Sequence, residues 1–312
     1  MELARKSSML SQMLCTAATN GIVVPAFNVP YLPMVAAVAR AVSKCDAFSM
    51  IQVARLELTK FQAESLSAIA REYRRHADPE VVTLHLDHTP VIDEDEQRVD
   101  WETLIAEAIS IGYDSVMIDG SRLPLEQNIA VTRRVVEMAH PHGIMVEGEL
   151  GAVMGHELGP LPPYEELFSS RMGFTDPEDA RVFVRGTSVD WLSVSIGSIH
   201  GAISPGKKDK QKVQARLDIT RLRELRKATG IPLVLHGGSG IGQKYIDDAI
   251  KNGIAKINVA TDIRQPYERA LAADGVAYAQ EAVEDAVTKL VRDVYHIQGS
   301  ATRLRELVEK SR

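Results

Sequence analysis

The chain has 312 residues, 45% of them hydrophobic and 25% charged, and its 36 Lys and Arg against 42 Asp and Glu give a net charge of −6. This composition excludes a disordered chain, which would combine low hydrophobicity with high net charge. The negative balance argues against nucleic acid or an anionic membrane as the main partner, because both require concentrated positive charge. Length alone allows one domain or two.

The cysteines and the N-terminus bear on the compartment of the protein. Cys15 and Cys45 do not form a C-x-x-C pair, so neither a thiolate metal site nor a disulfide framework is expected. The first residues mix charges and lack the apolar stretch of a secretory signal. No run reaches the roughly 18 apolar residues of a membrane span. We therefore expect a cytoplasmic protein.

Eight short, nearly continuous apolar runs recur along the chain, as in strands that are buried on both faces of a parallel sheet. They are residues 23–28, 49–53, 81–87, 115–120, 144–149, 191–197, 232–237 and 255–260. Helical patterns separate them, for example at 32–43, 61–76, 101–111, 124–140, 176–185 and 219–228. The stretch 279–312 predicts one long further helix, with a break near Gly299.

Eight strands that alternate with helices over about 250 residues match a (β/α)₈ barrel. Periodicity does not prove closure, so a doubly wound open sheet stays an alternative, although Asn28-Val29-Pro30 is not a Gly-rich nucleotide-binding turn. We expect a single-domain barrel over residues 1–312 with an extra C-terminal helix. Two long connections, 151–174 and 201–214, follow strands on the side where barrel enzymes bind substrate, which predicts active-site loops.

Potential metal ligands stand where several of these strands end. His88 and His236 close the third and seventh strands, and His200 follows the sixth. In a barrel these ends converge, and three imidazoles with one open position suit a catalytic zinc ion. Any one of them is equally well explained as a hydrogen-bonded, partly buried residue, but the three together favour a metal site. His85 lies inside the third strand and could be a donor behind the ligands.

Gly237-Gly238-Ser239-Gly240 follows the histidine of the seventh strand and precedes a helix that begins near Gln243. Backbone N–H groups without side chains at a helix N-terminus form a phosphate cradle, and barrel enzymes usually bind phosphate after strands seven and eight. Alone, the stretch could equally be a flexible turn. Beside a candidate metal ligand it predicts a phosphorylated carbonyl substrate, from which a carboxylate removes a proton while the metal draws charge.

Six motifs in the same order resemble those of the class II, zinc-dependent ketose-bisphosphate aldolases, which act on fructose or tagatose bisphosphate. The motifs are His85-Leu86-Asp87-His88, Met117-Ile118-Asp119-Gly120-Ser121, Glu147-x-Glu149-Leu150-Gly151, Gly197-x-x-His200-Gly201, His236-Gly237-Gly238-Ser239-Gly240 and Asn258-Val259-Ala260-Thr261. The resemblance covers nearly the whole chain. It implies a lyase that cleaves a ketose (bis)phosphate reversibly to dihydroxyacetone phosphate and an aldehyde through a zinc-stabilised enediolate.

The resemblance also implies roles for particular residues. Asp87 would be the acid–base group at the aldehyde oxygen, and Glu157 in the mobile loop would handle the proton of dihydroxyacetone phosphate. The implied zinc ligands are His88, His200 and His236, with Glu149 when the ion leaves its catalytic position. The implied substrate contacts are Gly201, Gly237, Ser239 and Thr261 at the phosphate, with a monovalent cation (Na⁺ or K⁺) nearby, and Asn28 and Asn258 in the sugar pocket. A homo-oligomer, dimer or tetramer, is implied as well.

Three departures from the family pattern concern the loops around the aldehyde half of the substrate. The family usually has a Ser/Gly-rich turn after the second strand, where residues 53–59 read Val-Ala-Arg-Leu-Glu-Leu-Thr. Arg55 in this segment could contact a distal anionic group or form a surface salt bridge. Residues 30–33 replace a common Glu near the helix start, and residues 156–163 lack the usual Gly-Gly-Glu-Asp pattern. Ala260, where the fructose branch tends to have Asp, favours a tagatose-type or other ketose.

Two other functions stay open from the sequence. One is a sugar-phosphate isomerase or epimerase with the same enediolate chemistry, and the other is a non-catalytic sugar-phosphate-binding barrel. The presence of every expected ligand, together with Asp87 and Glu157, argues against loss of catalysis. Lysines at 207–212 stand beside the expected phosphate site, so the net charge says little about the substrate. We expect an aldolase with a small-molecule substrate and neither nucleic acid nor membrane as partner.

Overall fold

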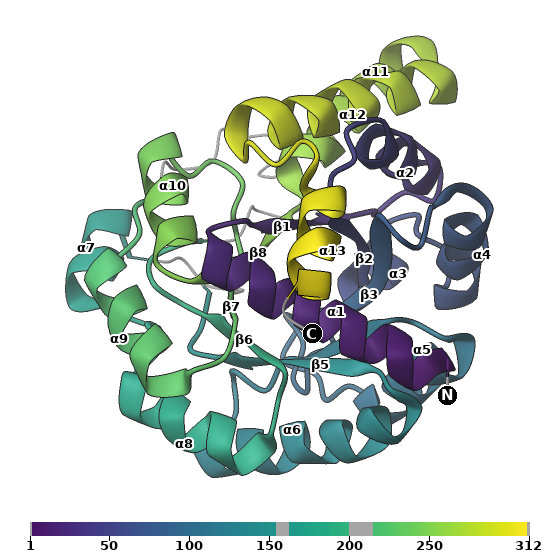
Figure 1. Cartoon of the computed structure of the whole chain (residues 1–312). Coiled ribbons are helices and arrows are strands. Elements are labelled where there is room, and N and C mark those ends of the chain that lie inside the picture. Colours follow the sequence, from purple (N-terminus) through teal and green to yellow (C-terminus); the bar gives the residue numbers. More distant parts are fainter. Residues whose placement is uncertain (1, 154–161, 200–214, 311–312) are drawn as a thin grey trace.

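The computed structural model describes residues 2–153, 162–199 and 215–310 of the chain. Eight parallel strands pair in chain order, and the last pairs with the first, so the sheet closes into a barrel (Figure 1). The strands are β1 (Val24–Asn28), β2 (Ser49–Ala54), β3 (Val82–Asp87), β4 (Ser115–Ile118), β5 (Met145–Leu150), β6 (Trp191–Val194), β7 (Leu233–Leu235) and β8 (Ile254–Val259). The predicted barrel is confirmed, and the open sheet is excluded.

Helices surround the strands on the outside of the barrel (Figure 1). They are α2 (Met34–Lys44), α3 (Arg55–Lys60), α4 (Leu66–His76), α5 (Trp101–Ile111), α6 (Leu125–Ala139), α7 (Tyr164–Ser170), α8 (Pro177–Thr187), α9 (Ile219–Thr229), α10 (Gln243–Lys251) and α11 (Thr261–Asp274). The sequence signals for helix ends explain several of these bounds. The Asp100 side chain accepts a hydrogen bond from Thr103 N–H at the start of α5, and Gly112 ends it with φ of 90°, a conformation that favours glycine.

The two stretches singled out in the sequence contain more structure than expected. The break predicted near Gly299 is confirmed, because α13 (Ser300–Lys310) begins directly after it, and α12 (Val276–Lys289) ends earlier in a π-helical turn, η2 (Leu290–Val294). The break precedes Ser300, whose hydroxyl accepts a hydrogen bond from Phe48 N–H and so fixes α13 beside β2. The expected loop 151–174 contains α7, while the expected loop 201–214 lies outside the described residues.

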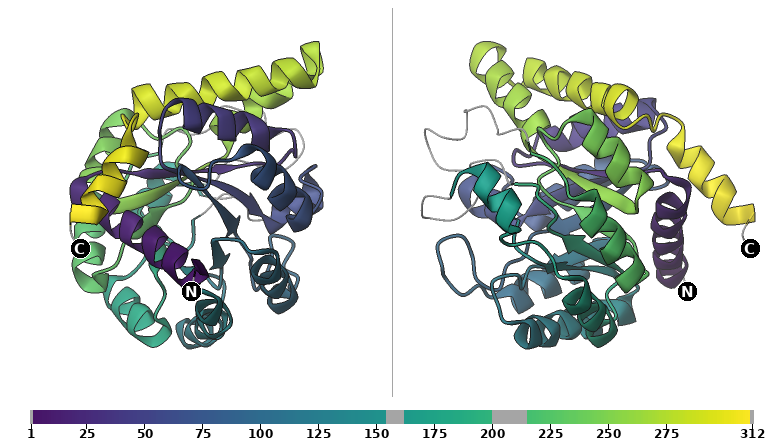
Figure 2. Two further views of the ribbon diagram at one scale, coloured as in Figure 1. Left: turned by 45° about the vertical axis from the view of Figure 1, so that its right-hand side comes forward. Right: turned by 90° about the vertical axis from the view of Figure 1, so that its left-hand side faces the viewer.

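The N-terminal and C-terminal helices lie at the end of the barrel where the strands begin. There α1 (Glu2–Asn20), which the sequence analysis did not predict, and α13 lie side by side (Figures 1 and 2). Buried Leu10, Met13 and Leu14 pack α1 into the core. The helices α11 and α12 pack against each other and extend beyond the barrel (Figure 2). Because α1 and α13 cover the end where the strands begin, we expect the functional site at the opposite end, where the strands end.

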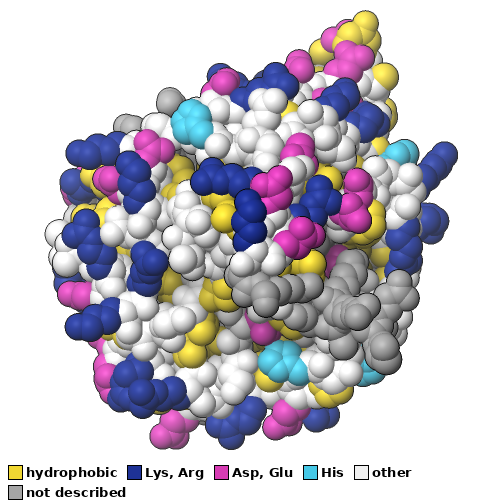
Figure 3. Space-filling model, viewed as in Figure 1, with side chains coloured by type: hydrophobic (Ala, Val, Ile, Leu, Met, Phe, Trp, Pro, Cys, Tyr) yellow, Lys and Arg dark blue, Asp and Glu magenta, His cyan; other side chains and the backbone are white. Residues whose placement is uncertain are grey.

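The surface carries charges of both signs. On the face seen in Figure 3, Lys and Arg side chains are interspersed with Asp and Glu. Among the described residues, no helix combines the length and the apolar character that crossing a membrane requires.

An ion pair lies inside the barrel, below the ends of the strands. Lys256 and Glu147 are buried, and their Nζ and Oε2 atoms are 2.9 Å apart. The indole N–H of Trp191 donates to the same carboxylate oxygen at 2.8 Å, and Lys256 also donates to Asn258 Oδ1 at 2.7 Å. Buried charges are costly unless they are paired and hydrogen-bonded, and this pair is both.

Replacing Lys256 with Met should destabilise the protein, because it leaves Glu147 buried without its counter-charge. The free energy of unfolding in urea should fall by about 3–5 kcal/mol. The exposed Lys251→Met is the matched control and should change it by less than about 0.5 kcal/mol. Equal stability of the two variants would show that the buried pair does not hold the barrel together.

Candidate metal centre and substrate pocket

The carboxyl ends of the strands surround a pocket to which most strands contribute. The residues that line it include Asn28, Ala54, Asp87, His88, Asp119, Glu149, Gly237, Gly238, Ser239, Asn258 and Thr261. Each of them lies within four residues of the end of a strand. The closed barrel brings these separate strand ends to one place, as the sequence analysis predicted.

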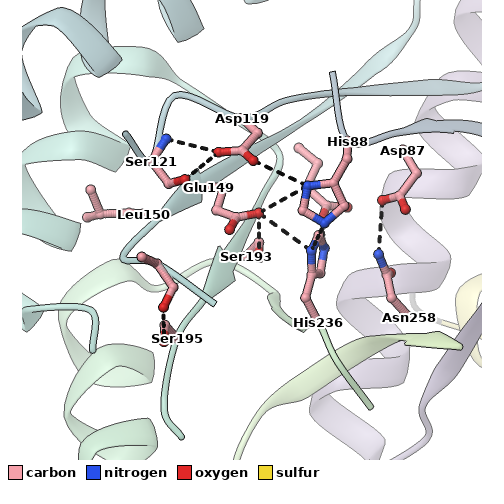
Figure 4. A network of polar contacts seen from close by, with 12 residues as sticks. Asp87, His88, Asp119, Ser121, Glu149, Leu150, Ser193, Ser195, His236 and Asn258 are labelled. Carbon is pink, nitrogen blue, oxygen red and sulfur yellow. Dashed lines mark hydrogen bonds and ion pairs between the residues drawn. The ribbon is translucent and has the colours of Figure 1, made fainter. Parts of the chain in front are cut away.

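Two imidazoles converge at the centre of this pocket (Figure 4). His88 follows β3 and His236 follows β7, and His236 Nδ1 lies 2.7 Å from His88 Nε2. Their rings meet edge to face with centroids 4.5 Å apart. The prediction that strand-end histidines meet is thus confirmed for these two, while His200 lies outside the described residues.

A carboxylate orients each imidazole from behind. His236 Nε2 lies 2.8 Å from Glu147 Oε1, and His88 Nδ1 lies 3.3 Å from Asp119 Oδ2. In each ring the nitrogen opposite this contact therefore points toward the other ring. Carboxylates that hold the second nitrogen of an imidazole in this way are typical of metal-binding histidines. The arrangement indicates one small volume toward which both imidazoles direct a nitrogen.

Further carboxylates complete a donor set around this volume (Figure 4). Glu149 Oε2 lies 3.5 Å from His236 Nδ1 and 3.8 Å from His88 Nδ1. Two groups have potential ligand atoms within 4.8 Å of one another: Asp87, His88 and His236, and His88, Asp119 and Glu149. Imidazole nitrogens combined with carboxylate oxygens suit zinc and similar divalent ions. The residues present therefore fit a divalent metal.

The electrostatics of these groups also fit a cation. Burial and the charge of Asp119 raise the pKa of Glu149 well above its usual value. Burial works against the charged form of His88, but the carboxylates of Asp87, Asp119 and Glu149 outweigh it and raise the pKa of His88 to about 10. These shifts indicate that the carboxylates crowd more negative charge into the buried site than the nearby cationic groups balance. A bound divalent cation would balance this charge.

Asp87 is held by side-chain amides on both carboxylate oxygens. Asn258 Nδ2 donates to Oδ1 at 2.9 Å, and Asn28 Nδ2 donates to Oδ2 at 2.9 Å. Gln52 Nε2 lies 3.3 Å from the same Oδ2 and 2.7 Å from Asn28 Oδ1. Burial would raise the pKa of Asp87, but the charges of His88 and Lys256 outweigh it and hold that pKa below its usual value. Asp87 is therefore an oriented, ionised carboxylate.

The loops after β7 and β8 have the features of an anion cradle. A Cβ atom on Gly237 would lie 2.5 Å from Ile199 O, and one on Gly238 would lie 2.5 Å from Ile257 Cγ2, so neither position has room for a side chain. Ser239 Oγ is buried without a hydrogen-bond partner among the described residues. Thr261 begins α11, where N–H groups at a helix start favour an anion. Gly237, Ser239 and Thr261 thus fit a phosphate, and Gly201 lies outside the described residues.

The connection after β2 forms part of the pocket wall away from the anion cradle. Arg55 Nη1 is 3.2 Å from Asp93 Oδ2, and Arg55 is not among the pocket-lining residues. The structure thus places Arg55 in the salt bridge that was its alternative interpretation. Glu57 lines the pocket instead and is buried. Burial raises the pKa of Glu57 to about 8, and Asp87 adds to this effect.

A family model described as "Fructose-bisphosphate aldolase class-II" matches residues 8–303. The chain belongs to the class II fructose-bisphosphate aldolase family. It is therefore an enzyme of the lyase class, and the predicted resemblance is confirmed.

Solved structures agree with the family assignment. The YdjI aldolase from Escherichia coli K12 is 26% identical, with a TM-score of 0.73 over 94% of this chain and 98% of the other. A putative fructose-1,6-bisphosphate aldolase from Coccidioides immitis is 27% identical, with a TM-score of 0.73 over 93% and 97%. Fructose-bisphosphate aldolase from Campylobacter jejuni, at 19% identity and a TM-score of 0.70 over 93% and 95%, shares the fold.

Sequence reasoning did not assign roles to several residues of this class II aldolase site. Asp119 and Glu147 stand in the quoted motifs, but their contacts with His88 and His236 were not predicted. Asp119 directly follows β4, and that position was the available signal, whereas Glu147 lies inside β5. Lys256 and Gln52 lie inside apolar runs that carry no functional signal of their own. His85 is buried with Nδ1 2.8 Å from Ser115 Oγ. The expected base Glu157 lies outside the described residues.

Replacing Asp119 with Asn should weaken divalent metal binding, because the neutral amide no longer holds His88 by charge. We expect the dissociation constant for Zn²⁺ to rise about 10–100-fold, measured by competition with a chromophoric chelator. Asp95→Asn, which removes an exposed carboxylate from the same region, is the control and should leave the constant as it is. Unaltered Zn²⁺ affinity in Asp119→Asn would contradict the orienting role of Asp119.

Proposed function

We propose that this class II aldolase uses a divalent metal, zinc by preference, to cleave a ketose phosphate reversibly to dihydroxyacetone phosphate and an aldehyde. The observation that carries the proposal is the pair of carboxylate-oriented imidazoles, His88 and His236, beside the ionised Asp87 and the anion cradle. His88, His236 and the predicted ligand His200 would hold the metal, with Glu149 as an alternate ligand. A bound Zn²⁺ would polarise the carbonyl and hydroxyl oxygens of the substrate.

Asp87 has the position and charge for the acid–base step. An ionised carboxylate can take the proton from the substrate hydroxyl during cleavage and return it to the aldehyde oxygen during condensation. Lys256 supports this role, because its contact with Asn258 Oδ1 turns Asn258 Nδ2 toward Asp87. Gln52 fixes Asn28 in the same way. The amides therefore keep the carboxylate aimed into the pocket.

The remaining residues bind the substrate at its phosphate and sugar portions. Gly237, Ser239 and Thr261 would take the first phosphate, and Asn28 and Asn258 would line the sugar portion. Glu157 as the base for the dihydroxyacetone phosphate proton, Gly201 as a phosphate contact and a monovalent cation nearby stay predictions from the resemblance. The same holds for a single domain over the whole chain, a cytoplasmic location and a homo-oligomer.

A cleavage assay on ketose mono- and bisphosphates, before and after chelation, tests the proposed function. We expect release of dihydroxyacetone phosphate, its loss on removal of metal, and recovery when Zn²⁺ is added back. Cleavage that survives complete metal removal would contradict the metal dependence. Conversion without release of a shorter aldehyde would favour the isomerase alternative, and absence of any conversion would favour the binding-protein alternative.

Two substitutions should separate metal binding from proton transfer. Asp87→Asn should keep Zn²⁺ but lose about 10²–10⁴-fold in kcat, because the amide cannot accept the proton. His236→Ala should lose both Zn²⁺ and turnover, because it removes a ligand. Metal content by mass spectrometry and turnover by a coupled assay measure the two effects. Normal Zn²⁺ content in His236→Ala would contradict the ligand assignment.

A further inference from the structure

Glu57 is an unusual feature of the substrate pocket. β2 ends at Ala54 and α3 begins with the next residue, in place of the Ser/Gly-rich turn expected from the resemblance. Glu57 is the buried residue of α3 and is only 6% exposed although it carries a carboxyl group. Its Oε2 accepts a hydrogen bond from Ala54 N–H at 2.8 Å, so the helix start itself points Glu57 inward.

The two oxygens of Glu57 have different surroundings. Oε2 also lies 3.4 Å from Asn28 Nδ2, the same atom that donates to Asp87. Oε1 has no hydrogen-bond partner among the residues that the structure describes, and Glu57 lines the pocket. Leu56, Phe61 and Ile92 line the pocket too, so part of its wall is apolar. Because Glu57 Oε1 is partly removed from water and lacks a partner in the described part of the chain, a hydrogen bond to a polar group of a bound ligand would be favourable there.

The position of Glu57 assigns it to the aldehyde half of the substrate. The anion cradle follows β7 and β8, whereas α3 follows β2, and β8 and β1 separate β2 from β7 in the barrel. Asn28 links Glu57 to Asp87, the group proposed to act at the aldehyde oxygen. Only the side-chain amide of Asn28 therefore lies between Glu57 and the proposed acid–base carboxylate Asp87. Glu57 follows β2, whereas the proposed phosphate site follows β7 and β8.

The cations near Glu57 are bonded to other groups. Glu57 has no ion pair among the described residues. Three cations of this region are each bonded to another carboxylate: Arg55 to Asp93 at 3.2 Å, Lys60 to Glu94 at 2.6 Å and Arg264 to Glu268 at 2.7 Å. Arg122 lines the pocket and donates to the backbone carbonyl of Asp93. None of these four side chains forms an ion pair with Glu57, so no cation of the described ranges is held beside its carboxyl group, as a phosphate at that point would require.

We propose that Glu57 is a specificity-determining residue whose Oε1 exchanges a hydrogen bond with a hydroxyl group of the aldehyde half of the substrate. The ketose phosphate of this enzyme then carries a free hydroxyl, not a phosphate, at that point. A carboxyl group can accept from a hydroxyl when it is ionised and donate to one when it is protonated, so the contact works in either state. This inference rests on the proposed aldolase function.

Condensation with matched aldehydes tests the role of Glu57. The metal-loaded full chain is assayed with dihydroxyacetone phosphate and either glyceraldehyde or propionaldehyde, which share a three-carbon skeleton but differ in hydroxyl groups. Wild type should prefer glyceraldehyde in kcat/KM, and Glu57→Leu should reduce this preference at least about ten-fold, since a site that hydrogen-bonds a hydroxyl discriminates strongly against its absence. Glu57→Gln should restore most of the preference, because its amide also hydrogen-bonds a hydroxyl.

A phosphorylated aldehyde and a neighbouring carboxylate complete the experiment. Wild type should also prefer glyceraldehyde to glyceraldehyde 3-phosphate in kcat/KM, because the inference places a hydroxyl and not a phosphate beside Glu57, and the opposite preference would overturn it. Glu94→Leu, which also removes a pocket-lining carboxyl group, is the matched control and should keep the glyceraldehyde preference. Circular dichroism of each variant reports whether α3 and the barrel remain folded.

The outcomes distinguish the two proposals. If wild type condenses neither aldehyde, the aldolase function fails and the role of Glu57 falls with it. If wild type is active but Glu57→Leu lowers both aldehydes by the same factor, Glu57 is only structural and the inference alone is overturned. The specific role of Glu57 is also overturned if Glu94→Leu removes the preference as strongly as Glu57→Leu.

Discussion

The buried pair of Glu147 and Lys256 is the constraint on which the site depends. One oxygen of Glu147 meets Lys256 and Trp191, and the other lies 2.8 Å from His236 Nε2. Lys256 in turn fixes the amide of Asn258, which holds Asp87. The orientation of a candidate metal ligand and of Asp87, the proposed acid–base carboxylate, is therefore determined by the same ion pair. Because neither charge can be left unpaired in the barrel interior without a large penalty, the two groups are positioned together.

The two halves of the pocket are built by different means. The phosphate side uses backbone and glycines, where a Cβ atom at Gly237 or Gly238 would collide with neighbouring atoms. The opposite side uses side chains on a short helix, α3, that starts directly at the end of β2. A cradle made of backbone tolerates little change, whereas a short connection at the mouth of a barrel can be replaced without disturbing the strands. This contrast fits a chain whose motifs at the metal and phosphate side match the family pattern while its connection after β2 departs from it.

The sequence was most informative where a polar residue interrupts or follows an apolar run. All eight strands were located because strands buried on both faces are continuously apolar, and His88 and His236 were identified because they directly follow such runs. Residues that act from inside a run carried no comparable signal. Lys256 in β8 reads as an isolated polar position, and its partner Glu147 is 109 residues away. The N-terminal α1 was missed, although the burial of Leu10, Met13 and Leu14 shows that it belongs to the core.

The sequence by itself determined the eight alternating strands, the family resemblance and the set of groups that could hold a metal and a phosphate, because periodicity and strand-end residues are local properties of the chain. Closure of the barrel was decided by the pairing of β1 with β8. The tertiary structure decided which atoms of those groups face one another. His88 and His236 are 148 residues apart, and only closure of the barrel brings their nitrogens to 2.7 Å. It also decided that Arg55 pairs with Asp93 while Glu57 turns into the pocket. Such choices depend on distances between separate strand ends, which no local pattern encodes.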